Sequence, residues 1–450
     1  MHTGEGFIVR RSVGMTFAVV CGVALSGWAL GPADAPSLPP PDPDIFTIVT
    51  VDTAQELADA CWNLGSDTAV LIAPGTYDLA SVSFPNGQDG RLTIGRYGEP
   101  VISNIQIRGA TGNPHDVVIL GGGMDNPIVP FGIQVFTATD VLIADLSIGR
   151  VYYHAVAIQN DQGASRVGLY HCRLFDAGEQ IVKGNRGNNP GAEDVVIEFC
   201  DVFLTEGAIE HPDLGYCYTN AIDAIGGHRW VIRHNLIRGI YCQNGALAGP
   251  AILMWQGSTD TMVEGNTFVD CSRGVSLGLV SSEDHAGGMV RNNFFRWNPA
   301  AAYTVDVPIY TRSPDSAIYH NSILTHGLYG AAVEVRFSGA TGVQVRANLM
   351  DGAVLARDGA SPEVWDNSTG AQPEWFVDEA TGDLHLLPSA GAAMDQLDRL
   401  EDCGDDYDGV VRPASPSTVD LGADEVEAPI FVDGFESGDV SWWSGASGVP

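Results

Sequence analysis

A short phrase recurs nine times between residues 117 and 350. In each copy an apolar residue is followed three places later by a mostly small or amide residue, and two places after that by another apolar residue. The first positions are Ile119, Ile143, Leu169, Ile197, Ile232, Val263, Val290, Ile318 and Val345. Successive copies are 24 to 35 residues apart. A fixed phrase with variable spacing indicates a solenoid, in which equivalent rungs are joined by loops of unequal length.

The rungs are expected to be β-strands, because runs such as 195–197 and 230–232 are β-branched or aromatic and are bounded by turn residues. Stacked rungs lie ~4.8 Å apart, so equivalent side chains lie over one another. The middle position of the phrase should then form an amide ladder. Its members are Asn235, Asn266, Asn293, Asn321 and Asn348. Cys172 and Cys200 precede them in the same column, as a disulfide or as a buried thiol pair.

The N-terminus has the pattern of an export signal. Arg10 and Arg11 precede an apolar stretch that ends near Leu30, and a small-x-small cleavage site follows at 33–35. A membrane anchor is the alternative, since the stretch approaches spanning length. We therefore predict a signal peptide at 1–35, a Pro-rich linker at 36–47, the solenoid at 48–425 and a separate tail at 426–450.

Both ends of the solenoid carry recognisable segments. Residues 51–57 predict a short helix with Thr53 as N-cap and Glu56 three places later, and a strand and a Pro-Gly-Thr-Tyr turn follow at 70–77. This beginning resembles right-handed parallel β-helix proteins of the pectate-lyase type, and so do the closing segments 382–388, 406–409 and 420–425. The resemblance implies an all-β, right-handed parallel β-helix with a short N-terminal capping helix. It does not fix the reaction, because this fold has many functions.

Charge and cysteine content limit the partners. The formal net charge is −34, which argues against binding nucleic acid or an anionic membrane and also repels polyanionic polysaccharides at long range. Export would leave an odd number of cysteines, so at least one is unpaired. The cysteines that would remain after export are Cys61, Cys172, Cys200, Cys217, Cys242, Cys271 and Cys403. No CxxC spacing indicates zinc.

Lys183 is the single lysine of the chain. It follows Gln180 by three places, and Asp223 follows Asn220 with the same spacing one rung later. If those strands are in register, Gln180 lies over Asn220 and Lys183 over Asp223 on the outer face, with Ser276 continuing the row. The pair is either a reactive centre or a contact that only stabilises this face.

Some β-helix polysaccharide lyases use a lysine base and calcium, so the resemblance implies such a role for Lys183. The reaction removes the proton α to a carboxylate and needs a cation to hold the resulting charge. Arg186 or Arg233 could be that cation. Calcium could be bound by Asp223, Asn220 and Glu179. Lys183 must be neutral to act as a base, whereas an adjacent Asp223 carboxylate favours its charged form.

Two other functions remain open: a non-catalytic glycan-binding or cell-surface protein, and a glycoside hydrolase. Besides Gln180, we predict that His228, Trp230 and Trp255 bind substrate, with Trp230 and Trp255 as sugar-stacking platforms if they point outward. Trp255 follows Met254, and one of two neighbours must leave the core. We expect a secreted or periplasmic, monomeric protein that acts on polysaccharide and is not inserted in a membrane after signal removal.

Overall fold

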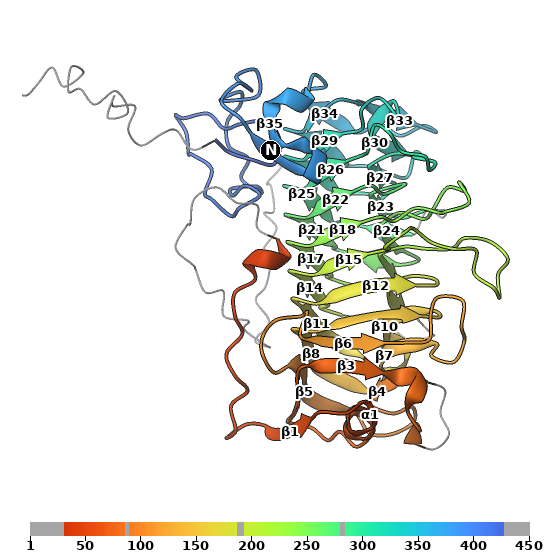
Figure 1. Cartoon of the computed structure of the whole chain (residues 1–450). Coiled ribbons are helices and arrows are strands. Elements are labelled where there is room, and N and C mark those ends of the chain that lie inside the picture. The colour runs from red at the N-terminus through yellow and green to blue at the C-terminus, as the bar shows by residue number, and fades with distance from the viewer. Residues whose placement is uncertain (1–30, 86–89, 187–192, 280–283, 427–450) are drawn as a thin grey trace, which may run out of the picture.

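The protein is an all-β, right-handed parallel β-helix, in which successive strands enter three long sheets in turn (Figure 1). The computed structural model describes residues 31–85, 90–186, 193–279 and 284–426. We call the sheets A, B and C in the order in which each rung enters them.

Sheet A has 12 parallel strands. They are β1 (Thr47–Val51), β2 (Thr68–Ile72), β5 (Ile102–Gly109), β8 (Ala138–Ala144), β11 (Ser165–Tyr170), β14 (Val196–Glu198), β17 (Val231–Arg233), β21 (Met262–Glu264), β25 (Met289–Arg291), β28 (Ala317–Tyr319), β31 (Gln344–Arg346) and β34 (Glu363–Trp365).

Sheet B has 10 strands. They are β3 (Gly75–Asp78), β6 (Val117–Leu120), β9 (Ser147–Val151), β12 (Arg173–Ala177), β15 (Asp201–Phe203), β18 (Leu236–Arg238), β22 (Thr267–Val269), β26 (Phe294–Arg296), β29 (Ser322–Leu324) and β32 (Leu349–Met350).

Sheet C also has 10 strands. They are β4 (Leu92–Ile94), β7 (Phe131–Val135), β10 (His154–Gln159), β13 (Val182–Asn185), β16 (Ile222–Ile225), β19 (Ile252–Trp255), β23 (Val275–Leu277), β27 (Ile309–Thr311), β30 (Ala331–Arg336) and β33 (Ala353–Arg357). A small parallel pair, β20 (Ser258–Thr259) and β24 (His285–Ala286), extends two loops after this sheet.

The repeated phrase spans sheet A, a turn and sheet B. Its first column, from Ile143 to Val345, is one continuous inward row of sheet A. The first copy was placed wrongly, because Ile119 pairs with Ile148 in sheet B. The rung before Ile143 contributes Ile107 instead. The Gly-rich segment after Ile119 imitates the phrase, although it leaves sheet B and not sheet A.

The asparagine ladder is present at the turn between sheets A and B. Each Nδ2 donates to the next Oδ1 at 2.8–3.0 Å, from Asn235 through Asn348 to a sixth member, Asn367. The two cysteines before them are buried free thiols, and the backbone N–H of Cys172 donates to Cys200 Sγ at 3.4 Å. The thiol-pair alternative is therefore the one found.

The two ends of the solenoid are covered differently. Helix α1 (Ala54–Trp62) lies at the N-terminal end, and the Thr53 side chain accepts the N–H of Glu56 as predicted (Figure 1). At the other end, residues 371–426 form a second hydrophobic cluster against the outside of β26 and β32. This segment contains the antiparallel pair β35 (Phe376–Asp378) and β36 (Asp383–Leu386).

The Pro-rich segment packs against sheet A. Ala35 and Leu38 contact Leu142 and Tyr170, and Arg108 Nη1 donates to the Pro39 carbonyl at 2.7 Å. The apolar stretch of the predicted signal peptide and nearly all of the predicted tail lie outside the described residues. Within the described part of the chain, no helix has the length and hydrophobicity needed to cross a membrane.

Candidate functional site

One row of side chains on the outer face of sheet C contains the predicted site. Register pairs Lys183 of β13 with Asp223 of β16, as the sequence spacing predicted. The row continues through Leu253 to Ser276. Because side chains alternate along a strand, the neighbours Val182 and Ile222 point into the core. We call this line the sheet C row; its members are Thr93, Gln134, Ala157, Lys183, Asp223, Leu253, Ser276, Tyr310, Glu334 and Leu355.

Lys183, Asp223 and Trp255 form the centre of this row. Lys183 Nζ lies 2.9 Å from Asp223 Oδ2, and Trp255 Nε1 donates to Asp223 Oδ1 at 3.0 Å. Asp223 is fully buried and Lys183 is 6% exposed. Burial raises the pKa of the Asp223 carboxyl, and Lys183 and Trp255 act in the opposite direction. The Lys183 contact therefore opposes the effect of burial on the Asp223 carboxyl.

Several titratable groups surround this pair. Burial raises the pKa of Glu179, against the opposing charge of Lys183. Burial and the charges of Asp223 and Glu179 raise the pKa of Tyr218 to about 12. Burial lowers the pKa of His154 to about 3. Neither His154 nor Tyr218 was predicted, because neither lies in a repeated spacing; His154 begins strand β10, one rung before Lys183.

The predicted polar neighbours are buried at the start of these strands. Gln180 and Asn220 are each 1% exposed, and the Asn220 side chain donates to the Pro250 carbonyl at 2.6 Å. Gln180 Nε2 and Asn220 Oδ1 are buried with no hydrogen-bond partner. The Gln180 carbonyl lies 2.9 Å from His154 Nδ1. These residues therefore lie together, as their spacing predicted.

The two predicted arginines, Arg186 and Arg233, lie in different parts of the molecule. Arg186 follows β13, is exposed and donates to the Gln256 carbonyl at 2.8 Å. Arg233 lies in sheet A, where its guanidinium pairs with Glu198 at 2.6 Å. The prediction that Arg233 supplies the cation beside Lys183 is wrong, because the two side chains are on outer faces of different sheets.

The predicted substrate-binding residues Trp230, Trp255 and His228 also lie in different parts of the molecule. Trp230 is fully buried in the core, which corrects its assignment as a sugar platform. Trp255 is only partly buried and points outward, while Met254 is in the core. His228 lies in the loop between sheets C and A, where its Nδ1 is 2.9 Å from Thr259 Oγ1.

The predicted calcium ligands do not fit a calcium ion as they are arranged. Calcium requires six to eight oxygen ligands. Both Asp223 oxygens are already engaged, one by the Lys183 ammonium and the other by Trp255. A second cation against Asp223 would be repelled by Lys183. Asn220 Oδ1 is buried with no hydrogen-bond partner, and Asp223 Oδ2 has only its ion pair with Lys183; these two atoms do not make a calcium site.

Two cavities open along the sheet C row, one on each side of Lys183. The larger has a volume of about 640 Å³ and is lined by Thr93 and Gln134 of the row, with Trp62 and Tyr97 nearby. The smaller, of about 140 Å³, contains Ser276, Tyr310 and Glu334 of the row.

Charge in these cavities differs from that of the whole chain. Arg273, Arg336 and Arg357 line the smaller cavity together with Asp306 and Glu334. The larger cavity has Arg91 and Arg96 beside Glu99 and Asp161. The chain as a whole has 22 basic and 56 acidic residues. The two cavities along the sheet C row therefore contain basic and acidic side chains in similar numbers, unlike the chain as a whole.

A disulfide fixes the loops beside the site. Cys217 and Cys242 are joined, which ties the segment before β16 to the segment before β19. Tyr216, beside Cys217, is 55% exposed.

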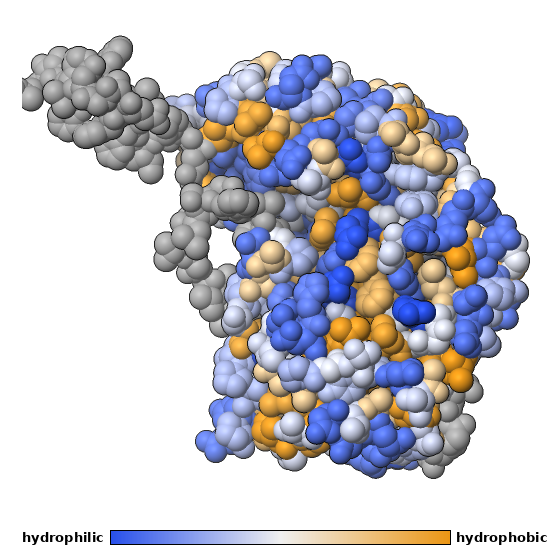
Figure 2. Space-filling view, in the orientation of Figure 1, coloured by the Kyte–Doolittle hydropathy of each residue, from blue (hydrophilic) through white to orange (hydrophobic). Residues whose placement is uncertain are grey.

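On the face that sheet B presents in Figure 2, hydrophobic residues lie in small groups among hydrophilic ones.

No protein-family model matches the sequence, and no curated relative matches it at a significant level. Among solved structures, the pectate lyase Pel9A has 13% identity and a TM-score of 0.46, covering 84% of this chain and 96% of that one. An alginate lyase from Paenibacillus sp. has 15% identity and a TM-score of 0.40, covering 71% and 94%. The Streptococcus pneumoniae surface adhesin PfbA has 13% identity and a TM-score of 0.42, covering 71% and 85%. Likeness at this level concerns overall shape alone.

Proposed function

We propose that this is a secreted protein that binds an extended polysaccharide along the sheet C row, with Lys183, Asp223 and Trp255 at the centre. The observation that carries this proposal is the continuity of the row: both cavities and the Lys183 pair share one line of paired residues. Successive rungs lie ~4.8 Å apart, so the face offers a repeating set of contacts to a repeating polymer.

The chemistry of the row suits a sugar chain. Its cavities combine carboxylates and arginines, which hydrogen-bond hydroxyl or carboxylate groups, with aromatic rings on which a sugar face can stack. Trp255 supplies such a ring beside Lys183. The local balance of charge allows an acidic polysaccharide to approach a chain whose net charge is −34.

The finer proposal is cleavage of a uronate polysaccharide by β-elimination, with Lys183 as the base. Two observations support this proposal: Lys183 lies midway along the row, and its side chain is buried. The base must lose its proton before it can take the one α to the substrate carboxylate. Since Asp223 stabilises the ammonium, the reaction requires substrate to separate the two side chains.

Secretion is part of the same proposal. The Cys217–Cys242 disulfide forms in an oxidising compartment and is unusual in a cytosolic protein. Together with the sequence pattern at 1–35, it supports export.

Binding is tested by calorimetry with alginate, polygalacturonate, chondroitin sulfate and a neutral glucan. For any member that binds, we expect Trp255→Ala to weaken affinity by about tenfold or more. Trp365→Ala is the matched control, since Trp365 lies on the outer face of sheet A. Equal affinities of the wild type and Trp255→Ala would refute binding along this row.

Cleavage is tested separately, by the ultraviolet absorbance of unsaturated uronate ends. Lys183→Met should abolish any such signal while retaining the β-strand circular dichroism of the wild type. Persistence of cleavage in a folded Lys183→Met protein would remove Lys183 as the base. Binding without cleavage in the wild type would favour the non-catalytic glycan-binding function.

A further inference from the structure

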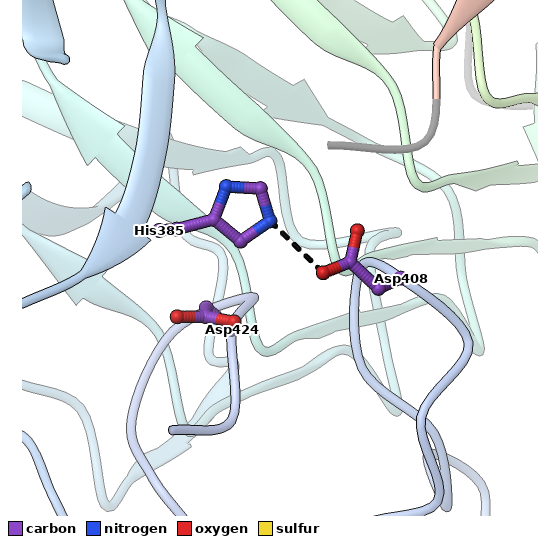
Figure 3. A group of neighbouring side chains, drawn as sticks. All are labelled: His385, Asp408 and Asp424. Carbon is purple, nitrogen blue, oxygen red and sulfur yellow. Dashed lines mark ion pairs between the residues drawn. The ribbon is translucent and has the colours of Figure 1, made fainter. Parts of the chain in front are cut away.

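A second cluster of ionisable groups lies far along the chain from Lys183. His385 belongs to β36, while Asp408 and Asp424 come from two later loops, and the three side chains point toward one another (Figure 3). One potential ligand atom from each lies within 4.8 Å of the other two. Within the described residues, this is the one such group of three or more His, Cys, Asp or Glu side chains.

The imidazole nitrogen that faces this cluster has no hydrogen bond. His385 is 9% exposed, and its Nε2 is buried without a hydrogen-bond partner. Asp408 Oδ2 lies 3.2 Å from that nitrogen, which is ion-pair distance, but the contact does not have hydrogen-bond geometry. Nε2 is therefore close to a carboxylate oxygen and is not tied to it by a well-aligned hydrogen bond.

The other side of the imidazole is held by a carboxylate. His385 Nδ1 donates to Asp383 Oδ1 at 2.5 Å, which directs the Nε2 lone pair toward Asp408 and Asp424. The Asp424 carboxylate is oriented in turn, because its Oδ2 accepts the backbone N–H of Leu386 at 2.6 Å. Metal-binding histidines characteristically donate their second ring N–H to a carboxylate, and metal-binding carboxylates are hydrogen-bonded by the backbone.

We propose that His385 Nε2, Asp408 and Asp424 bind a divalent first-row transition-metal ion, with Zn²⁺ as the reference ion. Zinc–nitrogen and zinc–oxygen bonds of ~2.0–2.2 Å place tetrahedral ligands about 3.3–3.5 Å apart. The 3.2 Å between His385 Nε2 and Asp408 Oδ2 is close to that separation. Water would complete the coordination. The imidazole ligand favours a transition metal over calcium, which prefers oxygen.

Electrostatics supports a cation at this place. The Asp383 and Asp408 carboxylates lie 2.5 and 3.2 Å from the two ring nitrogens of His385, and a ligand atom of Asp424 lies within 4.8 Å. A positive charge is thus strongly favoured between these groups, and a divalent ion supplies more of it than one proton.

Such an ion would cross-link the C-terminal segment that packs on the solenoid. Its ligands come from β36, from the loop at 405–411 and from the loop at 419–426. Tyr407, beside Asp408, stacks on Phe294 of β26 with ring centroids 4.0 Å apart. The Tyr407 hydroxyl lies 2.8 Å from Thr267 Oγ1 of β22. One metal would therefore bring three chain segments together on the outside of sheet B.

The test uses the full chain with any affinity tag removed. Chelator-treated protein is titrated with ZnCl₂ by calorimetry, and thermal unfolding is followed with and without the metal. We expect one zinc ion per chain and a higher melting temperature of the zinc-loaded protein. Co²⁺ in place of zinc should give the visible absorption of a tetrahedral site with nitrogen and oxygen ligands.

Variants locate the ion. Asp383→Asn, which changes only the partner of Nδ1, should weaken zinc affinity about 10- to 100-fold. Asp408→Asn and Asp424→Asn should weaken it further. The exposed Asp398→Asn, from the same segment, is the control and should bind as the wild type does. Absence of zinc-dependent stabilisation, or equal zinc affinity of Asp408→Asn and the wild type, would overturn the metal site and leave a protonated His385.

Discussion

At the scale of single residues, the asparagine column was the most predictable feature. Its apolar neighbours recur in sequence, and stacking forces equivalent positions together. The sixth member, Asn367, escaped prediction because sheet B ends at β32, so no apolar residue follows it in the phrase. Trp230 could not be placed by sequence, since its neighbours allow either face.

The ladder predicts a large cost for one amide. Asn293 donates to the Val263 and Arg291 carbonyls and to Asn321 Oδ1, and its own Oδ1 accepts from Asn266. Asn293→Ala should lower the free energy of unfolding by about 2–4 kcal/mol, because buried partners are left unpaired. Urea denaturation measures it. Asn126→Ala, on an exposed turn, should cost about 0.5 kcal/mol; equal costs would contradict a special role for the ladder.

At the scale of elements, spacing predicted which strands pair but not which sheet each one joins. Gln180 and Lys183 were matched correctly to Asn220 and Asp223 because both strands repeat one local pattern. Arg233 was assigned to the same site although it lies in sheet A, since distance along the chain does not report which face a strand presents. The cavities depend on loops of unequal length, which the phrase does not describe.

The disulfide gives a prediction for the loops beside the site. Cys217→Ser combined with Cys242→Ser should lose roughly 3 kcal/mol in the chain-entropy view, since the bridge closes a span of 25 residues. We also expect faster proteolysis in the segments before β16 and β19. Reductant should reproduce both effects in the wild type and change nothing in the double variant. Identical cleavage rates would show that the loops hold their positions without the bridge.

At the scale of the whole molecule, the solenoid and its helical cap were predicted, whereas the folding back of residues 371–426 was not. The sequence showed that these closing segments exist, but not that Tyr407 reaches β26. Contacts of that kind join residues more than a hundred positions apart, and no periodicity in the sequence predicts them. The packing of the molecule also buries several histidines, which makes its stability depend on pH.

Acidification should destabilise the protein through four buried histidines, of which His320 has a pKa held well below 6.5 by burial. Burial lowers the pKa of His154 and His285 to about 3 and that of His234 to about 4, from 6.5. At these histidines the unfolded chain therefore binds more protons than the native one below pH 6.5. Each histidine contributes stability that is lost as pH falls toward its native pKa, by up to about 1.4 kcal/mol per pH unit.

Carboxyl groups with a raised pKa act in the opposite direction, including Asp406 at about 7. A variant isolates the histidine contribution. His285→Gln should show a smaller fall in unfolding free energy between pH 6.5 and 4 than the wild type, by about one proton in slope. Urea denaturation across this range measures it. Parallel curves for the two proteins would mean that His285 does not remain neutral when buried.

The outer face of sheet A has a consequence for folding fidelity. Its charges alternate from rung to rung, from Glu198 through Arg233 and Glu264 to Arg291. Rungs this similar could pair out of order, and the asparagine column would accept a skipped rung without penalty. The charge pattern would not, because omitting one rung sets glutamate against glutamate or arginine against arginine. One row of this solenoid thus supplies cohesion, while another encodes the order in which the rungs must stack.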